Sequence, residues 1–328
     1  MGVNPQSVAV VVCAYTMERW DHLVASLLSA AHQSAPVREI VLVVDHNEAL
    51  LERARAELAP AIDGLRVLPN SRKQGLSGAR NTALAEVEAD IVVFLDDDAA
   101  AEAEWLDALL RHYDDASVIA VGGAARPVWP EGAQRPVTLP AEGGGRGELD
   151  WVVGCTYSGQ PQVARPVRNL MGCNMSFRRE VFLRIGGFSE DLGRVGRTPL
   201  GCEETELCIR AHNAHPGTRI VFEPDAVVRH QVSSDRLSWR YLRHRCYAEG
   251  LSKAAVSAMV GANQALETER AYVAKVLPGG FWRELTGGLR HQKQGLDGVL
   301  GAAAIMLALA STAAGYARAR AAGVRLAG

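Results

Sequence analysis

The stretch that decides the fold reads Ile91-Val92-Val93-Phe94-Leu95-Asp96-Asp97-Asp98. Apolar residues, mostly of strand-forming type, run directly into three carboxylates. A short continuous apolar run is typical of a strand that is buried on both faces, as in a parallel sheet. Open α/β sheets bind their ligands just beyond the carboxyl ends of the strands. The stretch therefore predicts a ligand site at its carboxylates.

The three carboxylates indicate that a cation binds at that site, because adjacent anions repel one another without one. If the strand geometry continues, Asp96 and Asp98 lie on one face and Asp97 points away. The oxygen donors of such a pair suit Mg²⁺ or Mn²⁺, and these ions usually complete their shell with substrate phosphates. The alternative is an acidic turn that caps the next helix, because residues 102–111 also look helical.

Composition describes an ordinary globular protein. With 328 residues, the chain can form one large domain or two smaller ones. A net charge of −2 gives no global attraction to nucleic acid or to an anionic membrane. Six scattered cysteines without CxxC spacing, and no visible signal peptide, indicate reduced thiols in a cytosolic protein. The uncharged segment 298–316, mostly Ala and Gly, is interpreted as a packed or interfacial helix rather than a membrane span.

Strands and helices alternate through the first part of the chain. Strands are expected at residues 8–13, 39–45 and 65–68, each followed by a helix or a Gly-containing turn that opens one. This spacing predicts βαβ units and a mostly parallel sheet. Tyr15 and Asp45 also follow strands, so they should share an edge with the carboxylates and form a nucleotide site. The missing GxGxxG argues against a dinucleotide-binding fold, and the missing GxxxxGK[ST] excludes a P-loop.

The second part of the chain is less regular. Residues 127–147 are rich in Pro and Gly, which predicts a long loop, either a mobile lid or a disordered insertion. A further Gly-containing loop at 191–201 leads into Glu203 and Glu204, which open a helix and suit its N-terminal dipole. A helix over residues 238–258 carries several basic side chains, and Arg243 and Lys253 are the candidates there for binding an anion.

Several short motifs together resemble family 2 glycosyltransferases, over roughly residues 8–258. They are Cys13-Ala14-Tyr15, Asp45, Gly78-Ala79-Arg80-Asn81, Asp96-Asp97-Asp98, Asn174-Met175-Ser176-Phe177-Arg178, Gly186-Gly187-Phe188, Glu203-Glu204-Thr205-Glu206-Leu207 with Arg210, and His230. The resemblance implies a GT-A fold, an α/β architecture around one mixed, mostly parallel sheet, with a helical C-terminal tail. It implies a nucleotide-sugar-binding half at 1–126, an acceptor-binding and catalytic half at 127–258, and a helical extension at 259–328.

The resemblance also implies an activity: inverting transfer of a sugar from a nucleotide diphosphate sugar to an acceptor hydroxyl, assisted by Mn²⁺ or Mg²⁺. Asp98 would bind the metal, with His230 as a further ligand. Donor-binding roles are implied for a wider set, with Asp45 at the base, Tyr15 lining the base pocket, Arg80 near base or phosphate, Asp96 near the ribose, and Asp97, Asn174, Arg243 and Lys253 completing it.

The catalytic base is expected in the acidic pair that opens the helix after residue 201. The family usually has Glu-Asp, whereas this sequence has Glu203-Glu204, and a glutamate reaches one methylene further. Glu204 is the predicted base, with Glu203 as the other candidate. The pair could instead serve only to complement the helix dipole.

Other functions compete with this reading. A haloacid-dehalogenase-like phosphotransferase also ends a strand with Asp-x-Asp, but near the start of the chain and with Thr or Val next, where this chain has Ala99 and Ala100. A non-catalytic nucleotide-sugar-binding protein would keep Asp45 and Asp98 without needing a base. Nucleotidyl transfer would call for a basic glycine-rich loop after the first strand.

The expected partners follow from the glycosyltransferase hypothesis. They are the nucleotide sugar and a saccharide, lipid-linked or small natural-product acceptor, but no nucleic acid. The expected location is the cytoplasm, including the inner face of the membrane. The C-terminal tail could make a peripheral membrane contact or a homodimer.

Overall fold

A computed structural model describes residues 6–193, 201–289 and 295–323 of the chain. They form two compact units. The first comprises residues 1–125, 161–198 and 203–230, and the second 126–160, 199–202 and 231–328. The division predicted from the sequence, at 1–126, 127–258 and 259–328, stays a prediction. Most of the loop predicted at 191–201 lies outside the described residues.

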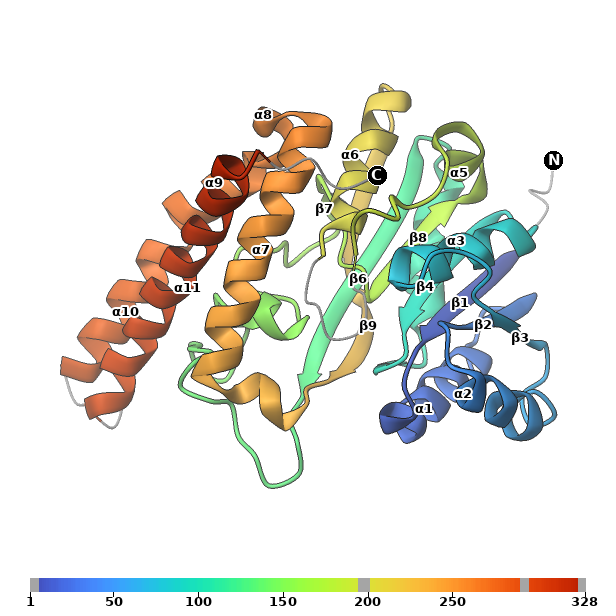
Figure 1. The fold of residues 1–328 in the computed structure, drawn as a ribbon, viewed down its shortest axis with the longest axis horizontal. Helices are drawn as coiled ribbons and strands as arrows, with labels where there is room; N and C mark the ends of the chain where they lie inside the picture. The colour runs from blue at the N-terminus through green and yellow to red at the C-terminus, as the bar shows by residue number, and fades with distance from the viewer. Residues whose placement is uncertain (1–5, 194–200, 290–294, 324–328) are drawn as a thin grey trace. The chain divides into compact units, whose positions relative to one another are not determined.

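One mixed sheet organises the first unit (Figure 1). Its order is β3-β2-β1-β4-β8-β6-β9-β5, and β7 also pairs with β9. The strands are β1 Val8–Ala14, β2 Glu39–Val44, β3 Leu65–Pro69, β4 Ile91–Asp96, β5 Ala99–Ala101, β6 Val118–Val128, β7 Arg165–Pro166, β8 Asn174–Arg178 and β9 Arg219–Gln231.

Pairing is parallel among β3, β2, β1 and β4, where helices return the chain between strands as predicted. The pairs β4–β8, β6–β8, β5–β9 and β7–β9 are antiparallel. The expectation of a mostly parallel sheet is therefore correct for the first half only. A long loop rather than a βαβ crossover leads to β8, so β8 is free to enter the sheet in the opposite direction.

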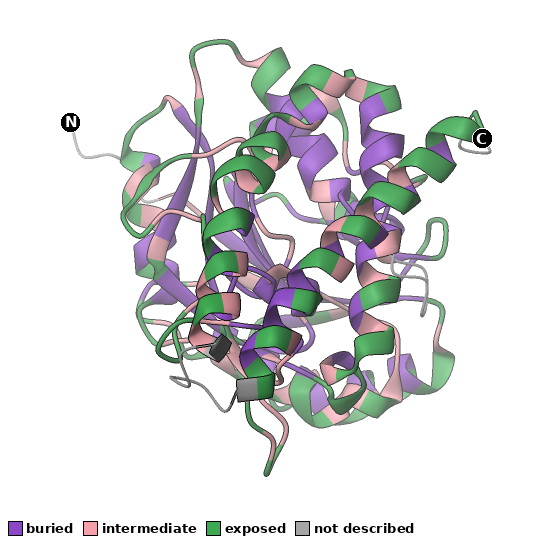
Figure 2. Cartoon of the chain, turned by 90° about the vertical axis from the view of Figure 1, so that its left-hand side faces the viewer, coloured by how far each residue is buried: buried purple, intermediate pink, exposed green. Residues whose placement is uncertain are grey.

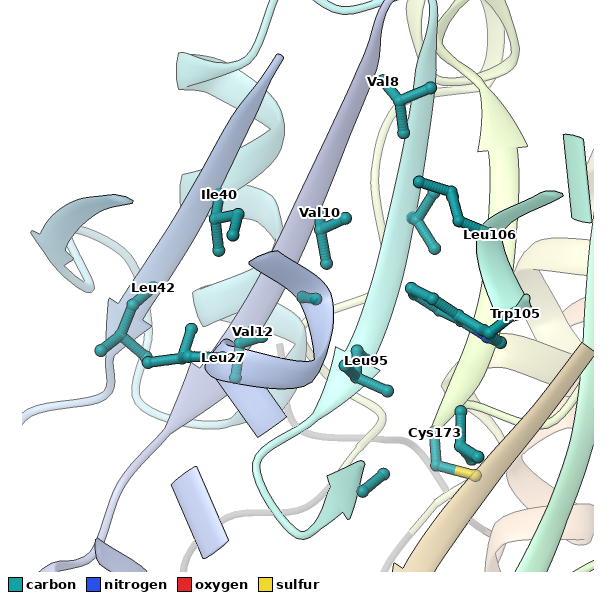
Figure 3. Packing of buried hydrophobic residues seen from close by; sticks show 14 of the residues in the cluster. Val8, Val10, Val12, Leu27, Ile40, Leu42, Leu95, Trp105, Leu106 and Cys173 are labelled. Carbon is teal, nitrogen blue, oxygen red and sulfur yellow. The ribbon is translucent and has the colours of Figure 1, made fainter. Parts of the chain in front are cut away.

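Helices cover both faces of this sheet. They are α1 Trp20–Ala31, α2 Glu48–Arg53 with a π-helical continuation at Ala54–Leu58, α3 Leu76–Glu86, α4 Trp105–Leu110, α5 Arg179–Ile185 and α6 Glu203–Ala214. Alternate residues of each strand face opposite sides. On one side, Val10 and Val12 pack with Leu27 of α1 and Trp105 of α4 (Figure 3). On the other, Val11 packs with side chains of α3, α5 and α6.

The second unit is mainly helical, and its helices carry both buried and exposed residues (Figure 2). They are α7 Trp239–Val260, α8 Ala262–Ala265, α9 Glu267–Lys275, α10 Leu277–Leu289 and α11 Gly295–Ala321. Helices α7 and α11 approach closely through glycines: a Cβ on Gly250 would lie 2.1 Å from the Thr312 carbonyl oxygen, and one on Gly315 would lie 2.0 Å from that of Tyr247.

Helix α11 contains the segment predicted to be a packed or interfacial helix. Within the described residues, it is the helix whose length and composition would allow it to cross a membrane. In its most apolar stretch 44% of the residues are buried inside the protein. Packing against α7 and α10 accounts for this buried side, and contact with a membrane stays a prediction.

Asn174, at the start of β8, ties the centre of the sheet together. Its side chain is fully buried, accepts a hydrogen bond from Trp105 Nε1 at 2.8 Å, and donates to the carbonyls of Ala124 and Ala226 at 3.0 and 2.9 Å. The indole N–H and the two backbone carbonyls, which lie on three different elements, thus depend on one side-chain amide for these hydrogen bonds. This side chain has no exposed surface for a ligand in this arrangement, and its predicted contact with the donor stays untested.

We expect Asn174→Ala to destabilise the first unit by about 3 kcal/mol or more, because it leaves buried polar groups unpaired. Urea unfolding followed by tryptophan fluorescence would measure the change. Asn213→Ala, at an exposed position on α6, is the matched control and should leave the midpoint nearly unchanged. Equal midpoints for both variants would contradict a structural role for Asn174.

Candidate active site

The carboxylates after β4 lie on a turn, not on a continuing strand. β4 ends at Asp96, and the chain turns through Asp97 and Asp98 into β5. The condition under which Asp96 and Asp98 were expected to share a face, a strand that continues through Asp98, is not met. The alternative, an acidic turn that caps the next helix, does not hold either in the described residues, because β5 separates the turn from α4, which begins at Trp105.

A strand pairing brings a histidine to this turn. β5 pairs antiparallel with β9 in the register that sets Ala99 opposite His230. His230 Nε2 lies 3.3 Å from Asp98 Oδ1, and both side chains are nearly completely buried. One ligand atom from each of Asp96, Asp98 and His230 lies within 4.8 Å of the other two. These residues, predicted from distant parts of the sequence, are thus brought together.

This donor set fits a divalent metal. Two carboxylates and an imidazole offer hard oxygen donors and one nitrogen, a combination that suits Mn²⁺, whereas all-oxygen sites are more typical of Mg²⁺. Asp97 adds further negative charge beside the cluster, and its Oδ2 is buried with no hydrogen-bond partner among the described residues. Burial and the neighbouring Asp98 raise the pKa of Asp97 to about 7. A bound cation would relieve this unfavourable burial of charge.

Arg19, to which no motif in the sequence pointed, also contacts the carboxylates. Its Nη1 lies 2.9 Å from both Asp97 Oδ1 and Asp98 Oδ2. Burial alone would lower the pKa of Arg19, but Asp98 and Asp97 raise it above its usual range. The signal that the sequence offered was a basic residue shortly after β1, the strand that pairs in parallel with β4.

Arg80 connects the turn to the acidic helix. Its side chain is only 2% exposed. Nη1 donates to Glu203 Oε1 at 2.9 Å, and Nη2 donates to Asp96 Oδ1 at 3.3 Å and to the Gly172 carbonyl at 2.8 Å. The guanidinium also lies over the ring of Phe188. Nη1 and Nη2 of Arg80 are thus both engaged by groups of the protein itself. The contact of Arg80 with the base or phosphate of a nucleotide, predicted from the sequence, stays untested.

The two candidate bases at the start of α6 differ in environment. Glu203 is 4% exposed and holds Arg80, while its Oε2 has no hydrogen-bond partner among the described residues. Glu204 is half-buried and accepts a hydrogen bond from Thr205 Oγ1 at 3.1 Å. The Glu203 carboxylate is thus committed to a buried ion pair, and the Glu204 carboxylate is more accessible.

Asp45 and Tyr15 follow neighbouring parallel strands, as expected. Asp45 is 7% exposed, and its two oxygens accept from Asn70 Nδ2 at 2.6 Å and from the Gly75 amide at 2.9 Å. Gly78 closes this turn tightly, because a Cβ there would lie 2.0 Å from the Lys73 carbonyl oxygen. Tyr15 is half-buried.

Arg243 and Lys253 belong to α7, in the second unit. Arg243 is exposed. Lys253 is largely buried, and its Nζ lies 3.4 Å from Glu249 Oε1 and 2.6 Å from Glu269 Oε1. Their predicted contacts with an anion stay untested.

Comparison with known proteins identifies the family of this chain. Residues 9–186 match the model of the family described as glycosyl transferase family 2. A Haloferax volcanii protein named glucosyl-dolichyl phosphate glucuronosyltransferase is 32% identical over 271 residues, which cover 82% of this chain and 83% of that protein.

Solved structures show the same fold. A mannosyltransferase from Pyrobaculum calidifontis, in complex with GDP-Man and Mn²⁺, gives a TM-score of 0.58 at 19% identity, over 94% of this chain and 87% of that one. GalNAc-T7 with UDP, GalNAc and Mn²⁺ gives 0.54 at 15% identity, over 84% of this chain and 57% of that one. With its mixed sheet and its carboxylates at the end of β4, the chain has the GT-A fold, and it belongs to glycosyltransferase family 2.

Proposed function

We propose that this glycosyltransferase moves a sugar from a nucleoside diphosphate to an acceptor hydroxyl with inversion, and that a divalent metal ion assists it. The observation that carries the proposal is the cluster of Asp96, Asp98 and His230 at the end of β4. The two solved neighbours, each in complex with Mn²⁺ and with UDP or GDP-Man, support a metal and a nucleotide as ligands of this fold.

Residues at the other strand ends would hold the nucleotide. Asp45 would accept a hydrogen bond from the base, with Tyr15 beside it. Asp96 would lie near the ribose and also contribute to the metal cluster. Asp45 is already fixed by Asn70 and Gly75, so it would meet the base in a preset orientation.

The metal, Mn²⁺ or Mg²⁺, would be held by Asp98 and His230 and would offset the negative charge that builds on the leaving diphosphate. Two of the carboxylates at the turn are paired with cations of the chain itself, Asp96 with Arg80 and Asp98 with Arg19. With two arginines beside three carboxylates, little net negative charge remains at the turn. A modest affinity for metal alone, completed by the donor phosphates, is the expected result.

Glu204 would remove the proton from the acceptor hydroxyl as the sugar transfers. Support comes from its exposure and from its neighbour, because Glu203 is occupied by Arg80. The acceptor oxygen would then attack the anomeric carbon from the face opposite the leaving diphosphate, which gives inversion. Glu203, in this proposal, positions Arg80 instead.

The acceptor class that we propose is a lipid-linked saccharide, used at the inner face of a membrane. Its support is the likeness to the Haloferax volcanii protein, whose name includes glucosyl-dolichyl phosphate. Arg243 and Lys253 are proposed to contribute positive charge for the phosphate of the donor or of the acceptor.

We expect one nucleoside diphosphate to stabilise the protein, and only when Mn²⁺ is present. Thermal shifts with UDP, GDP, dTDP and CDP, each with Mn²⁺ or EDTA, would measure this, since a ligand at 100 times its Kd adds about 2.7 kcal/mol. Asp98→Asn should lose the effect.

The control for that variant is Asp107→Asn, an exposed position on α4, which should behave like the wild type. Stabilisation of equal size in EDTA would argue against metal assistance. The absence of a response to every nucleotide would turn attention to phosphorylated small molecules and to the dehalogenase-like alternative.

We expect Glu204→Gln to lower the transfer rate by roughly 10²–10⁴-fold while the donor still binds, because the amide cannot accept the proton. Donor turnover and calorimetric binding would be measured on the same preparation. Glu180→Gln, exposed on α5, is the matched control.

Full activity in Glu204→Gln would remove it as the base. Equal loss of donor binding would show that the substitution acts on the fold. A protein that binds the nucleotide sugar but shows no transfer even as wild type would favour the non-catalytic alternative.

A further inference from the structure

Arg19 has no role in the proposed chemistry, yet it is in direct contact with the carboxylate turn. It ends a short 3₁₀ helix, Met17–Arg19, which starts where Thr16 Oγ1 accepts a hydrogen bond from the Glu18 amide. This cap orients the segment that carries Arg19. The Arg19 side chain is 24% exposed, so its guanidinium is partly withdrawn from water.

The contact bridges two adjacent carboxylates. Nη1 of Arg19 lies 2.9 Å from Asp97 Oδ1 and 2.9 Å from Asp98 Oδ2. Both aspartates are 5% exposed, so their mutual repulsion is poorly screened by water. Without a shared cation, the two side chains would favour orientations that separate them. Arg19 removes this tendency by binding both.

The contact also distinguishes the two oxygens of Asp98. Arg19 binds Oδ2, and the other oxygen, Oδ1, lies 3.3 Å from His230 Nε2. Asp98 is thus held at both oxygens, with its plane fixed between β5–β9 and the turn after β1. Outer partners of this kind orient metal ligands and commonly change metal affinity by about 10- to 100-fold when removed.

We propose that Arg19 is a positioning residue that fixes Asp98 in the orientation needed to bind the divalent metal. The inference rests on the metal site of the proposed function. Through the Arg19 side chain, the segment after β1, which also carries Tyr15, is joined to the metal-binding turn after β4. Arg19 itself touches neither the metal nor the donor.

A direct contact between Arg19 and the donor diphosphate is the competing role. The two carboxylates at 2.9 Å already neutralise the Arg19 guanidinium, which argues against it. The two roles predict different measurements: a positioning residue changes metal binding in the absence of nucleotide, whereas a diphosphate ligand changes nucleotide binding in the absence of metal.

The test is the Kd of Mn²⁺ for the full chain without nucleotide, measured by electron paramagnetic resonance of free Mn²⁺. We expect Arg19→Gln to weaken binding by about 10-fold or more. Arg19→Lys should lie between, because it keeps the positive charge but replaces the planar guanidinium with a compact ammonium on a more flexible side chain. In an Asp97→Asn background, Arg19→Gln should weaken Mn²⁺ binding less, because the charge that repels Asp98 is gone.

Arg229→Gln is the matched control. Arg229 precedes His230 on β9 but is 66% exposed at the side chain and pairs with Glu102 at 3.4 Å, so its loss should leave the Kd of Mn²⁺ unchanged. Thermal midpoints of all variants would be recorded first. If Arg19→Gln does not fold, Arg19→Lys and the Asp97→Asn background carry the comparison.

Equal Mn²⁺ affinity in wild type and in the Arg19 variants would overturn the inference while leaving the proposed function intact. Weaker nucleotide binding in EDTA, with metal affinity unchanged, would overturn it in favour of a diphosphate ligand. If the wild type binds no Mn²⁺, alone or with any diphosphate, the proposed function and the inference both fail.

Discussion

The buried guanidinium of Arg80 is the interaction on which the rest of the site depends. Burial disfavours the charged form of Arg80, but the carboxylates of Glu203 and Asp96 favour it more strongly, so the pKa of Arg80 lies above its usual range. Removing one partner of such a pair leaves an uncompensated buried charge, which typically costs about 3–5 kcal/mol. Because its partners lie at the ends of β4 and at the start of α6, the position of the metal carboxylates and that of the acidic helix are coupled.

Local sequence patterns were enough to predict the frame of the first unit. β1, β2, β3 and β4 follow from apolar runs, and the helices between them follow from their periodicity and caps. That Asp45 and Tyr15 directly follow neighbouring parallel strands also follows from these runs. These features depend on short stretches of chain, so a single sequence contains the information that specifies them.

The features that sequence reasoning missed depend on contacts between distant segments. The three-residue strand β5 is built from alanines, which favour a helix by propensity, and it becomes a strand because β9 pairs with it. Arg19 was not among the predicted residues, because its contacts with Asp97 and Asp98 join distant segments of the chain. Arg80 and Asn174 were recognised by type, but their burial, and hence their hydrogen-bond partners, could not be read from the chain. The predicted roles of these residues toward the donor stay predictions.

The pairing of β5 with β9 has a consequence for how this enzyme could change through evolution. Successive side chains of a strand alternate between faces, so a slip of one residue would turn His230 away and present Arg229 or Gln231 in its place. An insertion or deletion near Ala99 could therefore exchange the third donor for a cation or an amide without altering any of the three aspartates. Descendants of one ancestral chain could differ in metal requirement while their acidic motif stayed the same, and that motif alone would then be a poor guide to which of them use a metal.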